Sequence, residues 1–417
     1  MKPFKNYVYT ERAHFMCPNM HFGIMAQIKS RYDEKQVRQS VEILQKSHPF
    51  LQSIIAEEAD TGRFYYQVQD DLKIPVIRKA DIGLWQQDYD EISIQGWEVQ
   101  KECLLKILIY PAEKEFQILL IAHHLLCDGR GLLQLAEEFA GHYVKGSAPH
   151  FVEERLIQSL NDLPAGSDLP LVSKLVIDSA NRKWKKEQQR VKYETYKEFE
   201  RSFLRNNKII RDINTIGKRE LEEIQALCKQ HEVSVNDFLI AKMMLEDHTD
   251  KVVIAADIRS EAGCYRQGAM GNYATAFSVV VKKKEEDIFS LAKAVASKVS
   301  NICRRPQKKM LVLACYIHML PELIGAVAIS TLGDLESKAG AFVGKNLFGY
   351  GTQNGCSITN LGKIESDVLA SAVFIPPASP ANRKTSGVLT VNGTMKICSA
   401  IKNPARAASS HIQGLPG

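Results

Sequence analysis

The chain lacks several patterns that assign proteins to familiar classes. It has no GxGxxG or Walker pattern, nothing that resembles a nucleic-acid-binding module, no short-period repeat and no low-complexity tract. Its nine cysteines are odd in number and include no CxxC pair. Reduced thiols in the cytoplasm are therefore expected, rather than a disulfide framework.

The sequence also lacks a long uninterrupted apolar run. The longest candidate, residues 310–332, contains His318, Pro321 and Glu322 near its middle. A bilayer helix rarely carries a proline and a carboxylate at that depth, so the run predicts a pair of buried helices and no membrane span. Residues 1–12 are polar and charged, which does not fit a secretory signal.

Length and composition indicate a globular protein of more than one unit. The 417 residues are too many for one ordinary core and predict two sizeable domains, or two halves of a pseudo-repeat. The apolar share of 45% and charged share of 24% are typical of soluble proteins. The net charge of +6 permits an anionic ligand but does not argue for nucleic acid.

Hydrophobic periodicity predicts two strand-and-helix halves. Strands are expected at 20–29, 50–56, 63–69, 104–110, 116–123, 252–256, 272–282, 372–376, 387–392 and 395–400, and helices at 33–48, 132–143, 219–231 and about 235–247, the last capped by Ser234. Glycine and proline make 145–170 the best linker. The charged stretch 184–201 is expected to be a solvated helix or an extension of that linker.

The most informative segment is His123-His124-Leu125-Leu126-Cys127-Asp128-Gly129, between a predicted buried strand and a predicted amphipathic helix. Adjacent strand residues point to opposite faces, so only one of the two histidines can enter a given pocket. A histidine at a strand end, with a carboxylate four positions on, suits general-base catalysis because its ordinary pKa lies near neutral pH.

Taken alone, the motif is only moderately specific, and a structural strand-end histidine with an aspartate that caps the next helix would be the preferred interpretation. Three further segments favour a catalytic interpretation: Asp257-Ile258-Arg259 after a buried strand, Gly271-Asn272-Tyr273 at the start of another, and Ser357-Ile358-Thr359-Asn360-Leu361-Gly362.

With these segments in order, the sequence resembles the condensation-domain superfamily of acyltransferases, which includes chloramphenicol acetyltransferase. The resemblance runs from the His21-Phe22-Gly23-Ile24 strand and the Ser47-His48-Pro49-Phe50 turn to the closing hairpin, and HHxxxDG is its most specific element. It implies an α/β fold of two chloramphenicol-acetyltransferase-like mixed-sheet subdomains that meet in a V, with the active site in a tunnel between them. We expect subdomains at 1–160 and 206–402, a linker and helix at 161–205, and a disordered tail at 403–417, where relatives usually have a further helix.

The resemblance also implies roles for the motif residues. His124 would be the general base, and Asp128 would hold the histidine loop in shape by pairing with an arginine, for which Arg259 is the candidate. Gly129 would keep the turn tight and the tunnel open. His123 is expected to pack or hydrogen-bond on the opposite face as structural support.

The remaining candidates would contact the substrate or stabilise the oxyanion: Asn272, Ser357, Thr359 and Asn360. For 357–362 an ordinary loop of turn residues is an equally good interpretation. Cys127 lies at a variable motif position and is expected to be a packing residue. No metal is expected, because adjacent histidines cannot easily share one ion and no third ligand stands at suitable spacing.

The resemblance implies an acyltransferase that moves an acyl group to an alcohol or amine, with no permanently bound cofactor. The co-substrate would be an acyl-coenzyme A or a phosphopantetheine thioester, and an acyl or peptidyl carrier protein is a candidate partner. The alternatives are a free-standing condensation enzyme that forms amides and a non-catalytic scaffold that binds a carrier. The basic stretches 182–186 and 282–284 could meet phosphates or an acidic carrier, although a solvated face is the simpler interpretation of each.

Overall fold

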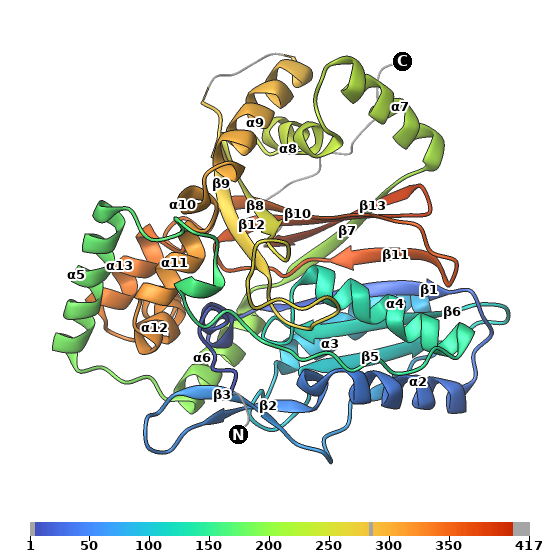
Figure 1. Cartoon of the computed structure of the whole chain (residues 1–417), viewed down its shortest axis with the longest axis horizontal. Helices are drawn as coiled ribbons and strands as arrows, with labels where there is room; N and C mark the ends of the chain where they lie inside the picture. Colours follow the sequence, from blue (N-terminus) through green and yellow to red (C-terminus); the bar gives the residue numbers. More distant parts are fainter. Residues whose placement is uncertain (1–4, 283–286, 403–417) are drawn as a thin grey trace.

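Two mixed sheets, one in each half, form the framework of the computed structural model, which describes residues 5–282 and 287–402 (Figure 1). The first sheet has the order β11-β1-β6-β5-β4, the second β7-β13-β12-β10-β8-β9, and β2 and β3 form a separate hairpin. The strands are β1 (His21–Ile28), β2 (Ser53–Glu57), β3 (Phe64–Val68), β4 (Val76–Arg78), β5 (Leu105–Tyr110), β6 (Phe116–His123), β7 (Ile209–Ile216), β8 (Lys251–Asp257), β9 (Ala274–Val280), β10 (Gly355–Ile364), β11 (Leu369–Ile375), β12 (Asn382–Val391) and β13 (Thr394–Lys402). The predicted fold class, two mixed-sheet α/β halves, is confirmed.

The helices cover the sheets and fill the space beside them. They are α1 (Arg12–Phe15), α2 (Glu34–Ser47), α3 (Trp85–Gln95), α4 (Gly129–Lys145), α5 (Leu171–Glu187), α6 (Tyr193–Asn206), α7 (Lys218–Gln230), α8 (Val235–Glu246), α9 (Ile288–Cys303), α10 (Pro306–Lys309), α11 (Leu311–His318), α12 (Pro321–Leu332) and α13 (Lys338–Asn346). Figure 1 shows α7, α8 and α9 against the second sheet, α2 and α4 against the first, and α5 beside α11–α13.

The alternation of side chains along β1 and β6 sets the two faces of the first sheet. Phe22, Ile24 and their even-numbered neighbours in β1 are fully buried in the main core. Gly23, on the other face, leaves room for the ring of Tyr89 from α3, whose edge would lie 3.1 Å from an added Cβ. Antiparallel pairing places His21 opposite His123, so that β6 brings the motif to the edge of the sheet nearest α1.

The second sheet separates two cores. Val388 and Ile358 face the core that α8 and α9 complete, whereas Leu389 and Leu361 belong to the main core of the first half. The sheet is therefore buried on both faces, and the face that carries Leu361 and Leu389 joins the two halves. β11 strengthens this join, because it lies late in the chain yet pairs with β1 of the first sheet.

Three stretches differ in local structure from what the sequence suggested. Residues 357–362, for which an ordinary loop was one of two interpretations, form part of β10, which pairs in parallel with both β12 and β8. The predicted strand at 50–56 begins with a 3-10 turn, Pro49–Gln52, before β2. The stretch 184–201 includes most of α6. The inner face of this helix is buried, because its tyrosine rings enter the main core, and Lys197 on the helix pairs with Glu200.

The apolar run at 310–332 forms two helices, as predicted. Within 5–282 and 287–402 no single helix is long and apolar enough to cross a membrane, although α11 and α12 together meet that test as a pair bent by 106°. Most of α12 is buried, from Leu323 to Ile329. The predicted tail at 403–417 and residues 283 and 284 of the second basic stretch lie outside the described residues.

Candidate active site

The end of β6 turns the two motif histidines to opposite sides, as the strand geometry predicted. His123 is buried beside the rings of His21 and Trp97, and its Nδ1 accepts a hydrogen bond from the backbone N–H of Leu125 at 3.2 Å. Its predicted packing on the opposite face is confirmed. His124 continues the sheet through its backbone N–H, which donates to the carbonyl of Met20 at 2.8 Å, while its ring enters the junction between the halves.

Two hydrogen bonds with Asn272 fix the state of the His124 ring. The amide nitrogen of Asn272 donates to the backbone carbonyl of His124 at 2.8 Å, so its Oδ1 is the atom that faces the ring. This Oδ1 lies 2.9 Å from His124 Nδ1 and can only accept, so the proton of the neutral ring is assigned to Nδ1. Nε2 then carries the lone pair that a general base needs.

Aromatic contacts hold the His124 ring from its faces. The ring of His14, on the short helix α1, stacks on it with centroids 4.1 Å apart and planes 15° apart. The ring of Phe22 lies 4.9 Å away at a tilt of 58°. Burial lowers the pKa of His124 from its usual 6.5, against hydrogen bonding and the nearby Asp128, which raise it. The ring is therefore neutral, and able to accept a proton, at neutral pH.

The surroundings of Asp128 favour its charged form, whereas those of His124 favour the neutral form. Its Oδ1 accepts from Arg259 Nη2 at 2.8 Å and from the backbone N–H of Gly131 at 2.9 Å, and its Oδ2 accepts from the backbone N–H of Tyr273 at 2.8 Å. Burial opposes the charge, but Arg259 and these hydrogen bonds outweigh it and lower the pKa of Asp128. The predicted Asp128–Arg259 ion pair is confirmed, and the same aspartate caps α4.

Two glycines make room where the halves meet. A Cβ on Gly129 would lie 2.9 Å from Leu361 and 3.1 Å from Phe374, both from the second half of the chain. The need for glycine at 129 therefore comes from packing across the junction, where a side chain would meet these two residues, and not from a positive φ. Gly271 differs, because its φ of +146° strains any other residue and a Cβ there would lie 2.7 Å from Leu156.

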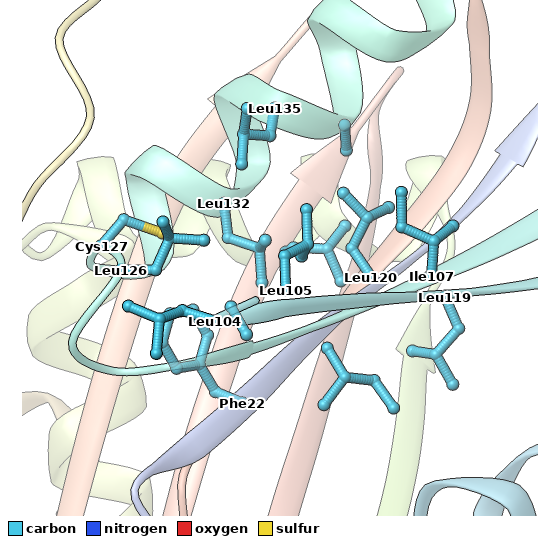
Figure 2. Close-up of a cluster of buried hydrophobic side chains, with 14 of the residues drawn as sticks. Phe22, Leu104, Leu105, Ile107, Leu119, Leu120, Leu126, Cys127, Leu132 and Leu135 are labelled. Carbon is cyan, nitrogen blue, oxygen red and sulfur yellow. The ribbon is translucent and has the colours of Figure 1, made fainter. Parts of the chain in front are cut away.

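Cys127 is a packing residue, as predicted. Its side chain is fully buried, and Figure 2 shows it among apolar side chains that include Leu126 and Leu132. Burial raises the pKa of its thiol well above the usual value, so the reactive thiolate is disfavoured.

The candidates on β10 are largely occupied by contacts within the second half. The Ser357 hydroxyl donates to Thr385 at 3.1 Å and accepts from the Asn382 side chain at 2.8 Å. The Asn360 amide donates to Asn236 at 3.2 Å, and its oxygen accepts from the backbone N–H of Gly362.

None of these β10 contacts reaches His124, and among the described residues the hydroxyl of Thr359 has no hydrogen-bond partner. Of the four proposed substrate or oxyanion residues, Asn272 is the one whose side chain hydrogen-bonds to His124 within the described part of the chain.

His14 is a neighbour of His124 that the sequence did not indicate. It lies on a four-residue helix ahead of β1, in a stretch with no motif around it. Its approach to His124 depends on how α1 docks between the halves, which no local pattern encodes.

No cluster of metal-ligating side chains surrounds His124 among the described residues, and one large cavity lies elsewhere. In the part of the chain that the structure describes, no group of three or more histidine, cysteine or acidic side chains could hold a metal ion. A cavity of about 660 Å³ is lined by Arg12 of α1, Arg63 and Tyr193, but not by His124.

Comparison with known proteins gives structural but not sequence matches. No protein-family model matches the chain, and no curated protein matches it. The epimerization domain from the third module of tyrocidine synthetase B matches with a TM-score of 0.56 and 16% identity, over 94% of this chain and 87% of that domain.

Two condensation domains are similar to the same extent. The first condensation domain of the calcium-dependent antibiotic synthetase, in complex with a substrate analogue, matches with a TM-score of 0.58 and 11% identity over 97% and 92% of the two chains. The starter condensation domain of rhizomide synthetase, a mutant in complex with C8-CoA, matches with a TM-score of 0.56 and 12% identity over 96% and 89%. At these identities the likeness establishes a shared fold.

Proposed function

We propose that this chain, which has the condensation-domain fold, is an acyltransferase that moves an acyl group from a thioester to an alcohol or amine, with His124 as general base. The observation that carries the proposal is the state of the His124 ring. Asn272 holds the proton on Nδ1 and leaves Nε2 without a partner among the described residues, and His124 belongs to the most specific motif in the sequence.

The proposed reaction uses neutral His124 as a base next to the thioester carbonyl of the bound donor. His124 Nε2 takes the proton of the acceptor hydroxyl or amine as that group attacks the thioester carbon. The carbon–sulfur bond then breaks, and the imidazolium returns its proton to the departing thiolate. No protein nucleophile is needed, which agrees with the buried and protonated thiol of Cys127.

The thioester donor would be acyl-coenzyme A or an acyl group on a phosphopantetheine arm. The likeness to a starter condensation domain that was crystallised with C8-CoA supports a coenzyme A donor as the first one to test. Asp128 and Arg259 would act at a distance, by fixing the loop that ends the strand of the base. They touch no reacting atom in this scheme.

The test is thiol release from a series of acyl-coenzyme A donors, each with a panel of alcohols and amines. The proposal predicts acceptor-dependent release, an ester or amide product by mass spectrometry, and loss of both in His124→Ala. The fold also occurs in an epimerization domain, so the product must be identified and not inferred from the fold.

The alternatives give different results in the same assay. A free-standing condensation enzyme would form amides only when both substrates are on carrier proteins. A scaffold would release no thiol with any donor and would bind a loaded carrier protein equally well after His124→Ala. Absence of acceptor-dependent transfer from every thioester, free or carrier-bound, would refute the proposal.

A further inference from the structure

His14 and His124 form a pair of stacked imidazoles with complementary free nitrogens. Near-parallel rings with centroids 4.1 Å apart bring their edges within reach of one bound group. His124 is tied to Asn272 through Nδ1 and leaves Nε2 as an acceptor. The question is which nitrogen of His14 carries a proton.

The surroundings of His14 favour a proton on Nε2. Nδ1 is buried and has no hydrogen-bond partner among the described residues. The residue as a whole is partly exposed, and Nε2, which makes no hydrogen bond to the described residues, is not among the buried atoms that lack a partner, so it is accessible. A buried N–H without a partner is rarer in proteins than an unpaired acceptor, so the proton belongs on the accessible nitrogen. Burial, with His124 and His123 nearby, lowers the pKa of His14 well below 6.5, so the ring has only one proton to place.

The oxyanion of the proposed reaction needs a donor, and the predicted donors are mostly committed elsewhere. Ser357 donates to Thr385, and the Asn360 amide donates to Asn236. His14 is instead in contact with the base itself, with no partner on either ring nitrogen within residues 5–282 and 287–402. An unsatisfied buried ring beside a catalytic base is the kind of group whose missing partner a substrate supplies.

We propose that His14 is a second catalytic residue, whose Nε2–H donates a hydrogen bond to the carbonyl oxygen of the acyl group while His124 Nε2 takes the proton of the acceptor. The inference rests on the proposed acyl transfer. The His14 proton stays on its ring throughout: the acceptor forms a bond to the carbonyl carbon, the carbon–sulfur bond breaks, and the acceptor proton passes through His124 to the thiolate. His14 stabilises the negative charge that builds on the oxygen in between.

Three variants distinguish the effect of the His14 hydrogen-bond donor from the effect of its aromatic ring. His14→Phe keeps an aromatic ring on His124 but removes the donor, and we expect kcat to fall by about 10²–10³-fold, the usual loss for one oxyanion donor. His14→Gln places an amide N–H near the position of Nε2 and should recover part of that loss. Thr359→Val removes the hydroxyl that is also free of partners, and should leave kcat above that of His14→Phe.

The folded state needs its own check. His14→Phe removes a buried unpaired nitrogen, so its melting temperature should equal or exceed that of the wild type. If His14→Phe transfers acyl groups at the wild-type rate, or if Thr359→Val shows the larger loss, the role of His14 is refuted while the proposed function stands. If the wild type itself transfers no acyl group, the proposed function fails and this role fails with it.

A measurement without turnover tests the premise. With ¹⁵N-labelled histidine, the ring resonances that His14→Phe removes from the eleven-histidine spectrum belong to His14. The inference predicts a neutral ring protonated on Nε2 at pH 7. A ring protonated on Nδ1, or on both nitrogens, would overturn the assignment whatever the activity of the wild type.

Discussion

His124 and Asp128 stand four residues apart in one motif, yet their environments are opposite. Asp128 is saturated: a guanidinium and two backbone N–H groups satisfy its oxygens, and its charge is stabilised. His124 has one side-chain hydrogen bond, stacks on another neutral ring, and has a lowered pKa that keeps it uncharged.

The difference separates a group that can react from a group that holds the fold. A saturated buried ion has no free valence to offer a substrate, and its loss leaves a buried partner charge unpaired. An aromatic base with a free nitrogen can bind and release a proton without disturbing its neighbours. The comparison therefore predicts different defects when each residue is changed.

The largest expected effect is on activity at His124. His124→Ala removes the base, and acyl transfer should fall by about 10²–10⁴-fold, the usual contribution of a positioned general base. Its melting temperature should fall less than that of Asp128→Ala, because the ring makes a single side-chain hydrogen bond and its loss leaves no buried charge unpaired. Thiol-release kinetics and thermal unfolding measure the two. If His124→Ala is as active as the wild type, His124 does not react, and its contrast with Asp128 does not hold.

Asp128→Ala should lower stability as well as activity. It leaves the largely buried Arg259 guanidinium without its main partner and removes the cap of α4, so the free energy of unfolding should fall by about 3–5 kcal/mol. The matched control is Asp257→Asn, because Asp257 binds the same guanidinium from a more exposed position and should cost about 0–1 kcal/mol. Equal melting temperatures for His124→Ala and Asp128→Ala would contradict the comparison.

Asn272 should matter through the base it orients. In Asn272→Leu the ring loses its Nδ1 partner, and a misplaced base should cost about 10²-fold in rate. Asn272→Asp keeps the acceptor oxygen but adds a negative charge, which raises the pKa of His124 and moves the acid limb of the pH–rate profile to higher pH. The pH profile of Asn272→Asp is the measurement, and an unshifted limb would show that Asn272 does not face the base.

A second buried histidine, His48, extends the comparison, because its pKa is raised whereas that of His124 is lowered. His48 is buried between Glu138 and Glu154, at 2.7 and 3.1 Å; burial opposes its charge, but the hydrogen bonds to both carboxylates outweigh this and raise its pKa to about 9. Its stabilising contribution is full below pH 6.5, where the unfolded chain is also protonated, and is lost as the pH rises through 9.

Urea unfolding between pH 6 and 10 measures this contribution as the difference between the wild type and His48→Gln. The difference should shrink by about 2–3 kcal/mol as the pH rises. A constant difference across that range would mean that His48 is not charged in the folded protein.

The smallest expected effect is at Cys127, which lies in the motif but takes no part in the proposed reaction. Cys127→Ala should keep the wild-type rate and lose about 1 kcal/mol of stability, from the small cavity left in the core. A rate defect comparable with that of His124→Ala would mean that the thiol takes part in the reaction, and kinetics of the variant beside its unfolding curve decide this.

The sequence predicted those parts of the site that depend on local geometry. Strand alternation separated His123 from His124, and the capping position of Asp128 follows from its place before a helix. The Asp128–Arg259 pair was predicted in another way, because the family resemblance implies an arginine partner for the motif aspartate and Arg259 was the candidate.

The remainder depends on tertiary placement that local patterns do not encode. The polar segment 357–362 forms a strand because neighbouring β8 and β12 satisfy its backbone and bury it, which overrides its turn-like composition. β11 crosses to the first sheet, and α1 brings His14 to the base, through docking of segments far apart in the chain.

The pH dependence of kcat/KM for thiol release tests the central claim most directly. A base with a lowered pKa stays deprotonated below the usual value, so the acid limb of the wild-type profile should have its midpoint below pH 6.5. The residual activity of His124→Ala should lack this limb. A wild-type midpoint above 6.5, or the same limb in His124→Ala, would show that His124 does not take the proton.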